Sequence, residues 1–141
     1  MNIYRPFTPI LSLLLIALTW QGAAQPPPST VTGEPWQRHT IDNTVEGADG
    51  SRPYDFNGDG LMDFVTPFEE GAEIRLYRHP GEAMREPWPY VSVGKVASPE
   101  DAFCVDLDGD GSVDVVSSTE GQDRSIYVHW GPTNPAEYMQ A

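Results

Sequence analysis

Short apolar stretches bounded by turn residues recur along the chain from residue 36 onward and predict β-strands. Large and polar residues alternate over 36–42, as in a half-buried strand, and Ile74 and Leu76 share one face of a later stretch. Prolines are scattered through every candidate, and no stretch longer than a turn has a helical apolar period, so helix should be nearly absent. The strands expected with clear bounds are 36–42, 62–68, 73–78, 88–93 and 125–130, and short strands should also flank the acidic stretches at 55–63 and 106–114.

These two acidic stretches, with the sequences DFNGDGLMD and DLDGDGSVD, share one layout. Acidic or amide side chains stand at positions 1, 3, 5 and 9, glycines stand at positions 4 and 6, and an apolar run follows. Acidic side chains this close together repel one another, and a hard cation that binds their oxygens would remove that cost. The glycines allow the positive φ values that wrap a backbone around an ion. The sequence therefore predicts two metal-binding loops that each lead into a strand.

The two loops belong to a longer internal repeat. Asp106 follows Asp55 by 51 residues, and the Glu-Pro-Trp triplet at 86–88 follows the one at 34–36 by 52 residues. A repeat of about 50 residues with four short strands is typical of a β-propeller blade. The predicted organisation is a signal peptide (1–24), a Pro-rich linker (25–34), a first blade (35–85), a second blade (86–133) and a tail (134–141).

The number of blades is too small for a closed propeller. Propellers typically close with about four to eight blades. This chain holds two, and 134–141 is a poor final strand. Either the chain is part of a longer protein whose missing blades complete the propeller, or other copies of the chain complete it. We expect the first of these alternatives.

Both segments resemble FG-GAP/VCBS repeats. At 55–65 and 106–116 the chain follows the pattern Asp-x-Asp-Gly-Asp-Gly-x-x-Asp with apolar residues after it, and Asn57 is the departure from that pattern. The resemblance implies an all-β fold: two consecutive four-stranded antiparallel blades of a partial β-propeller with calcium-binding loops, similar to those in the N-terminal region of integrin α chains. The wider run also resembles the opening blades of long exported bacterial VCBS-repeat proteins.

The chemistry of the loops agrees with two Ca²⁺ sites, since Ca²⁺ takes six to eight oxygen ligands in adaptable geometry. An EF-hand is excluded, because position 12 is Thr66 or Ser117 in place of a bidentate Glu and a strand follows each loop. Asn57 removes one charge from the first loop, so the second loop should bind more tightly. The other reading is a pair of acidic β-turns that bind no ion. The expected ligands are the side chains of Asp55, Asn57, Asp59 and Asp63 with the Leu61 carbonyl, and the side chains of Asp106, Asp108, Asp110 and Asp114 with the Ser112 carbonyl.

Composition narrows the classes of partner. The 141 residues include 21 Asp or Glu and 8 Lys or Arg, which gives a net charge of −13. An acidic surface of this kind argues against nucleic acid and against anionic membranes. The single cysteine, Cys104, excludes an internal disulfide and should be a small buried apolar residue, with a nucleophilic role as the alternative.

The first 24 residues have the features of a secretory signal peptide. Arg5 precedes an apolar run over 10–20, and small residues at 22–24 suit cleavage before Gln25. The alternative is a membrane anchor, but the apolar run is short for a span and no basic cluster follows it. We therefore expect an exported protein (periplasmic, cell-surface or extracellular) that keeps no membrane segment after cleavage.

The sequence offers few other candidate functional residues. A set of carboxylates on turns could bind a polyol or act as acid and base, and the alternative is that they are solvated turn residues. The tryptophans at 36, 88 and 130 should pack between blades, with an exposed sugar-binding platform as the alternative. No catalytic set stands out. The turn carboxylates are Asp49, Asp101, Glu69, Glu70 and Glu120.

The function expected from the sequence is that of an exported calcium-binding FG-GAP/VCBS repeat protein. It would act as a non-catalytic binding, adhesion or scaffold module, with an extracellular carbohydrate or protein as partner. The alternative is a fragment of a propeller-type carbohydrate-active enzyme, similar to a polysaccharide lyase.

Overall fold

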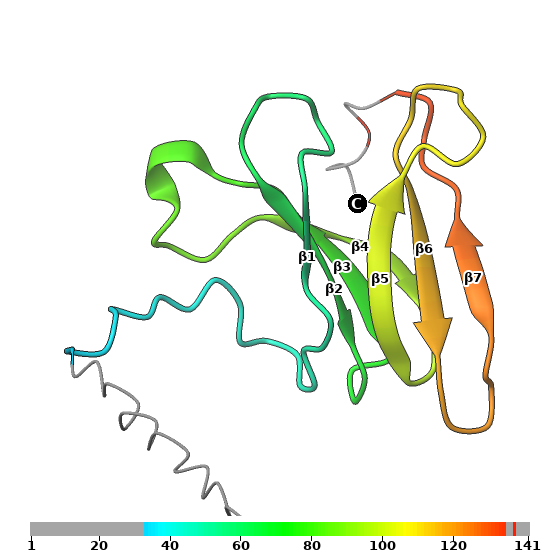
Figure 1. Ribbon diagram of the computed structural model, residues 1–141, viewed down its shortest axis with the longest axis horizontal. Helices are drawn as coiled ribbons and strands as arrows, with labels where there is room; N and C mark the ends of the chain where they lie inside the picture. The colour runs from blue at the N-terminus through cyan, green and yellow to red at the C-terminus, as the bar shows by residue number, and fades with distance from the viewer. Residues whose placement is uncertain (1–32, 135–136, 138–141) are drawn as a thin grey trace, which may run out of the picture. The chain divides into compact units, whose positions relative to one another are not determined.

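The computed structural model describes residues 33–134 and residue 137 (Figure 1). Two compact units divide the chain, Met1–Pro35 and Trp36–Ala141, and the fold lies in the second. The predicted signal peptide and nearly all of the linker and tail lie outside the described residues. Within the described part of the chain, no helix has the length and apolar character needed to cross a membrane.

The second unit is all-β, as predicted. Its strands form two antiparallel sheets, one with the order β1-β2-β3-β4 and the other with the order β5-β6-β7 (Figure 1). A short 3₁₀ turn, Gly81–Ala83, follows β3. The strands are β1 (Arg52–Tyr54), β2 (Asp63–Phe68), β3 (Glu73–Tyr77), β4 (Tyr90–Lys95), β5 (Pro99–Val105), β6 (Asp114–Thr119) and β7 (Ile126–His129).

The strand arrangement corrects one expectation. Residues 36–42 form no strand, because β4 pairs with β3 and takes the edge of the first sheet. The sheets divide between Lys95 and Pro99, so β4, which lies within the range predicted for the second blade, is the last strand of the first sheet. The second sheet has three strands in the described part of the chain, not four, which agrees with the expected lack of a final strand.

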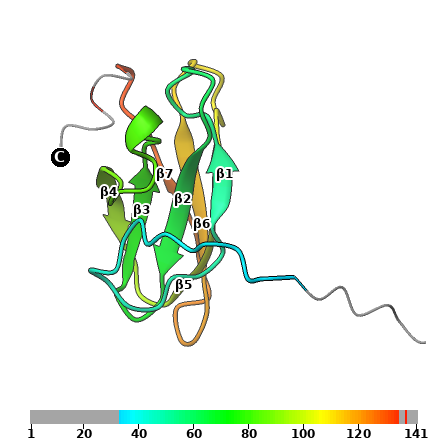
Figure 2. The same cartoon turned by 90° about the vertical axis from the view of Figure 1, so that its left-hand side faces the viewer.

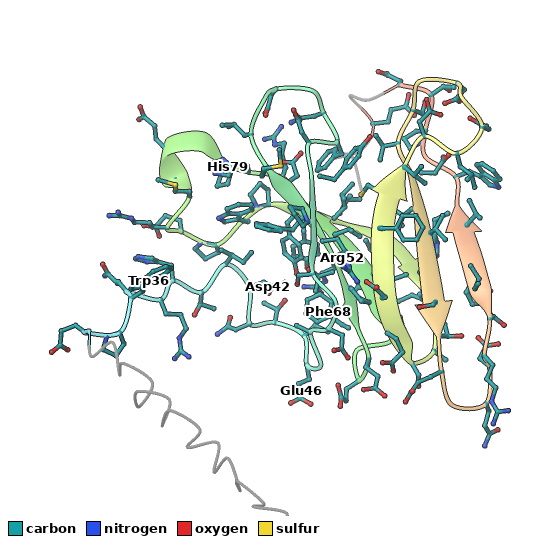
Figure 3. The ribbon with its side chains drawn as sticks, viewed as in Figure 1. Trp36, Asp42, Glu46, Arg52, Phe68 and His79 are labelled. Atoms are coloured by element: carbon teal, nitrogen blue, oxygen red, sulfur yellow. The ribbon has the colours of Figure 1, made fainter. Side chains whose placement is uncertain are left out.

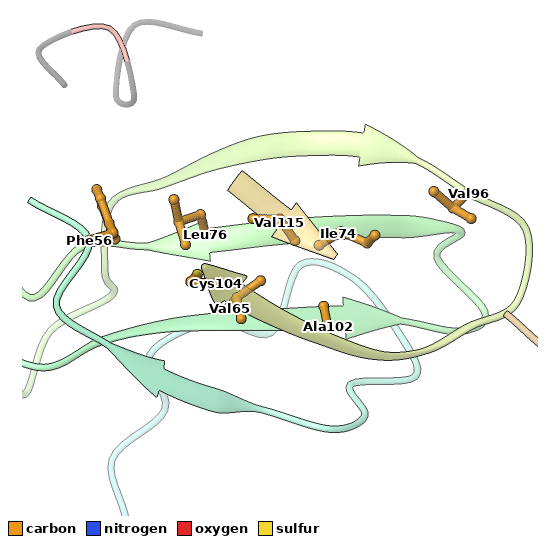
Figure 4. Packing of buried hydrophobic residues seen from close by; sticks show 8 residues of the cluster. All are labelled: Phe56, Val65, Ile74, Leu76, Val96, Ala102, Cys104 and Val115. Carbon is orange, nitrogen blue, oxygen red and sulfur yellow. The ribbon is translucent and has the colours of Figure 1, made fainter. Parts of the chain in front are cut away.

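The core lies between the two sheets (Figure 4). Val65 and Ile74 of the first sheet pack with Ala102 and Val115 of the second, and all four are almost completely buried. Cys104 belongs to the same cluster, which confirms that it is a buried apolar residue. Burial and the nearby Asp63 carboxylate raise the pKa of the Cys104 thiol to about 12. A thiol in this environment is a poor nucleophile.

The other face of the first sheet is covered by the segment that precedes β1 (Figure 2). Ile41 and Val45 from this segment pack on a cluster that contains Phe68, Tyr77 and Trp88. The backbone N–H of Trp88 donates to the Ile41 carbonyl at 2.9 Å. Residues 41–45 therefore belong to the packed domain even though they form no strand.

A buried ion pair fixes this segment to the sheet. The Arg75 guanidinium, on β3, donates to the Asp42 carboxylate at 2.6 Å, and the Tyr77 hydroxyl donates to the same carboxylate at 2.5 Å. Asp42 is labelled in Figure 3 and lies on the segment that precedes β1. Burial alone would raise the pKa of Asp42, but hydrogen bonds from Tyr77, Thr44 and Arg75 lower it to about 2. The Asp42 side chain is only 8% exposed, so this contact is part of the fold.

The tryptophans do not share the expected role. Trp88 is buried and lies 4.8 Å from His79 and 5.4 Å from Phe64 between ring centroids. Trp36 is 97% exposed and Trp130 is 61% exposed, so neither packs between the sheets. The prediction is wrong for these two residues because each lies outside the strands that pair.

Candidate metal centre

The two acidic loops lie at the same end of the two sheets (Figures 1 and 2). In the first loop, the Asp55 carboxylate accepts hydrogen bonds from the backbone N–H groups of Gly58 and Gly60, both at 2.8 Å. These glycines have φ values of 72° and 84°, which residues with a side chain rarely adopt. The loop therefore wraps around the carboxylate at its first position, as the glycine spacing predicted.

The second loop repeats this geometry. The Asp106 carboxylate accepts from the N–H groups of Gly109 at 2.8 Å and Gly111 at 3.0 Å, and the two glycines have φ values of 78° and 88°. The internal repeat seen in the sequence thus extends to individual hydrogen bonds.

The aspartate at position nine ties each loop to the end of the third strand in its repeat. Asp114 is 2% exposed, and its carboxylate accepts from Leu107 N–H at 3.0 Å and from Gly131 N–H at 2.9 Å. Asp63 is fully buried and makes the matching pair of bonds with Phe56 at 3.1 Å and His79 at 2.7 Å. These two carboxylates therefore stabilise the fold through hydrogen bonds, whether or not they also bind an ion.

Burial also affects the ionisation of these groups. It raises the pKa of Asp63, as do the nearby carboxylates of Asp59 and Asp55, while hydrogen bonds from His79 and Phe56 oppose the rise. A cation beside the loop would favour the ionised form, because an opposite charge at short range lowers the pKa of a carboxyl group.

The second loop brings three acidic side chains together. Carboxylate oxygens of Asp106, Asp108 and Asp114 all lie within 4.8 Å of one another, and the first two residues are exposed. Such an acidic cluster can hold a metal ion that enters from solvent. The donors are all oxygen atoms, and 106–114 contains no His or Cys. Hard cations such as Ca²⁺ and Mg²⁺ prefer donors of this kind.

The first loop differs at Asn57. Its amide donates to the Asp59 carboxylate at 3.0 Å, and its side-chain oxygen accepts from Asp59 N–H at 3.0 Å. Among the described residues, no three acidic side chains of the first loop converge as those of the second loop do. The two predicted sites are therefore unequal in this structure.

Some predicted ligands have other partners. The Asp110 carboxylate accepts from Ser112 N–H at 2.7 Å and lies outside the convergent set, and the Asp59 carboxylate accepts from Leu61 N–H at 2.9 Å. Ser112 is buried, whereas Leu61 is exposed. Coordination by the backbone carbonyls of Leu61 and Ser112 stays a prediction.

A second group of carboxylates lies at the opposite end of the sheets, because Glu69 follows the end of β2 and the first acidic loop precedes its start. Oxygens of Asp49, Glu69 and Glu100 lie within 4.8 Å of one another. The sequence singled out Asp49 and Glu69 but missed Glu100. The isolated bridge between Gly50 and Asp101 brings these segments together, and no short-range pattern could have revealed it.

The electrostatics of this group are unfavourable in the absence of a cation. Partial burial raises the pKa of Glu69 and of Glu100, and the neighbouring carboxylates of Glu70, Glu120 and Asp49 raise both further. One oxygen of Glu100 is shielded from solvent and has no hydrogen-bond partner.

Asp101 does not join this group. It accepts two hydrogen bonds from the Arg52 guanidinium, one of them at 3.0 Å from Nε, and this contact lowers the pKa of Asp101. Asp101 is therefore an ion-pair partner in this structure.

Comparison with known proteins identifies one family. Residues 55–117 match the family model described as an FG-GAP-like repeat. The match runs from the first position of the first loop into β6, so it includes both acidic loops. No curated protein and no solved structure matches the chain.

Proposed function

We propose that this chain, whose residues 55–117 are an FG-GAP-like repeat, is an exported calcium-binding module with a non-catalytic binding or scaffold role. The repeat and the two antiparallel sheets support a propeller-type repeat module. The observation that carries the calcium proposal is the convergence of Asp106, Asp108 and Asp114 in the second loop.

Calcium suits this cluster better than the other common metals. Zinc sites usually include His or Cys, and the second loop has neither. Mg²⁺ demands near-ideal octahedral geometry, whereas Ca²⁺ accepts irregular sets of six to eight oxygens that include backbone carbonyls and water. An open loop with three carboxylates and exposed backbone offers such a set.

The proposed role of the ion is to stabilise the loop. Asp106, Asp108 and Asp114 repel one another when no cation is present, and Ca²⁺ would replace that repulsion with attraction. A ligand that binds only the folded state stabilises it by about 2.7 kcal/mol when its concentration is 100 times Kd.

Isothermal titration with CaCl₂ tests the proposal, with Asp108→Asn as the main variant. Asp108 is exposed, so its replacement should weaken calcium binding in the second loop without disturbing the core. Glu82→Gln is the matched control, because it removes the same charge from an exposed position in the 3₁₀ turn. Equal affinity of all three proteins, or no heat of binding in the wild type, would refute a calcium site in the second loop.

Export and the nature of the partner are also part of the proposal. The features of residues 1–24 support secretion, and the charge of −13 disfavours nucleic acid and anionic lipid as partners. An extracellular carbohydrate or protein is the partner class that we propose. N-terminal sequencing of the secreted form tests export, and a glycan array probed with and without calcium tests carbohydrate binding.

A second candidate is that the chain belongs to a carbohydrate-active enzyme. The raised pKa values of Glu69 and Glu100, within one group of carboxylates, favour this alternative, since acid-base catalysts often have shifted pKa values. A product assay on any glycan that binds separates the two functions. Turnover that Glu100→Gln abolishes would establish the enzyme, whereas binding without turnover would support the module.

A further inference from the structure

The outer edge of β7 has no strand beside it in the described part of the chain (Figure 1). β7 pairs only with β6, and its residues Ile126 and Tyr127 are 76% and 37% exposed. An exposed strand edge presents unpaired N–H and C=O groups and is a template for another strand. We call this edge the open edge.

The repeat defines which kind of strand fits the open edge. In the first sheet Val65 pairs with Leu76, and in the second sheet Val116 pairs with Val128. β3 and β7 are therefore equivalent, with an offset of 52 residues, since 128 minus 76 is 52. In the first sheet, β4 occupies the edge of β3 that corresponds to the open edge of β7, and Leu76 of β3 pairs there with Val91 of β4.

The same offset locates a segment that corresponds to β4. Subtracting 52 from Tyr90–Lys95 gives residues 38–43, which follow the Glu-Pro-Trp triplet at 34–36 just as β4 follows the triplet at 86–88. Residues 36–40 are all exposed and form no strand. The chain then enters the packed domain at Ile41 and Asp42, on the first sheet, whose edge β4 already fills.

We propose that residues 36–40 of one copy add to the open edge of β7 in a second copy, as its antiparallel fourth strand. Strand addition of this kind uses main-chain hydrogen bonds for affinity and alternate side chains for specificity. The register of β4 on β3 predicts the pairing: Arg38 opposite His129, His39 opposite Val128, and Thr40 opposite Tyr127. The proposal does not depend on calcium binding or on the ligand of the module.

Charge favours this occupant. Residues 36–40 contain Arg38 and no acidic residue, although the chain as a whole carries a charge of −13. β7 itself has no Asp, Glu, Lys or Arg, and the turn from β6 carries Glu120, Asp123 and Arg124, which sum to a charge of −1. The two copies are both strongly acidic outside this contact and would repel each other, so association should strengthen when salt screens that repulsion.

The contact joins different surfaces of the two copies. Each copy offers one exposed segment at residues 36–40 and one open edge, so the contact is head-to-tail and leads to rings or open chains. The average mass should therefore rise steadily with protein concentration and should not stop at a dimer unless two copies close a ring.

Disulfide trapping tests the register. One protein carries His39→Cys and the other carries Val128→Cys, both with Cys104→Ala so that no other thiol is present. Opposite positions in an antiparallel pair have the Cα separation that a disulfide needs, so mild oxidation should join the two proteins roughly tenfold faster than a mismatched pair. His39→Cys mixed with Ile126→Cys provides the mismatched control. Equal rates for both mixtures, or no product in either, would refute the proposed register.

Sedimentation velocity tests the association itself. Thr40→Pro removes a backbone N–H from the exposed segment and should abolish the rise of mass with concentration. Thr40→Ala keeps that N–H and should behave as the wild type. Because residue 40 lies outside the sheets, the circular dichroism of both variants should match the wild type. A wild type that stays monomeric at all concentrations, or a Thr40→Pro variant that still associates, would overturn the proposal.

Discussion

Replacing Asp114 by asparagine should destabilise the protein even when no metal is available, because this side chain holds two backbone N–H groups. Its carboxylate accepts from Leu107 N–H and from Gly131 N–H, and the residue is 2% exposed. An asparagine has nearly the same shape but only one acceptor oxygen, so one of these buried N–H groups would face an NH₂ donor.

The size of the effect follows from that lost acceptor. Leaving one buried N–H group without a partner costs about 1–3 kcal/mol. For a domain of this size each kcal/mol corresponds to roughly 4–8 °C in Tm. In excess chelator, Asp114→Asn should therefore melt about 10 °C below the wild type, by a mechanism that involves no ion.

Asp108→Asn provides the contrast. Asp108 is exposed, and its carboxylate accepts a hydrogen bond from Asp110 N–H at 3.1 Å. In chelator this variant should melt within a few degrees of the wild type, because surface substitutions usually change stability by less than about 0.5 kcal/mol. In CaCl₂ the Tm of the wild type should rise, and the Tm of Asp108→Asn and of Asp114→Asn should rise by less.

Thermal melts followed by circular dichroism, in chelator and in CaCl₂, measure both effects. A CaCl₂ concentration of about 2–5 mM is suitable, because extracellular calcium modules typically bind with Kd values of about 10⁻⁴ to 10⁻³ M. If Asp114→Asn is as stable as the wild type in chelator, the assigned structural role of Asp114 is wrong. If Asp108→Asn keeps the whole calcium-dependent gain, the assigned metal site is wrong.

Three further predictions concern the rest of the fold. The pKa of Asp42 is lowered to about 2, so its contribution to the free energy of unfolding is present above the unfolded-state pKa of 3.8 and is lost as the pH falls toward 2. Asp42→Asn should remove on the order of 1–2 kcal/mol of this pH-dependent stability, as measured by urea unfolding over the same pH range. Burial raises the pKa of Cys104 to about 12, so a disulfide exchange reagent should label it only after unfolding. Gly111 has a φ of 88°, so Gly111→Ala should cost about 1–2 kcal/mol, whereas Gly111→Asn should cost less, as measured by urea unfolding.

The features that the sequence predicted well depend on residues close together in the chain. The hydrogen bonds from Gly58 and Gly60 to Asp55 join residues at most five positions apart, so a nine-residue pattern contains all that is needed to form them. β2 and β3 were also expected nearly in full, because alternation along one strand reports which face is buried.

The features that it missed depend on competition between distant segments. Residues 36–42 have the alternation of a strand, but a strand requires a partner, and β4 occupies the edge that they would need in the first sheet. Glu100 joins Asp49 and Glu69 only because β5 comes to lie beside the segment that enters β1. Local pattern cannot decide which of two similar segments pairs or which distant carboxylates meet.

The contact between Asp114 and Gly131 connects the two proposals. Asp114 belongs to the acidic cluster of the second loop, and Gly131 follows β7 by two residues. An ion held by Asp106, Asp108 and Asp114 would fix the Asp114 carboxylate, and that carboxylate holds the chain where it leaves β7. A strand edge binds another strand best when its own backbone is already ordered, since ordering it on binding costs conformational entropy. Calcium in the second loop and strand addition at the open edge would therefore reinforce each other, although neither needs the other to occur.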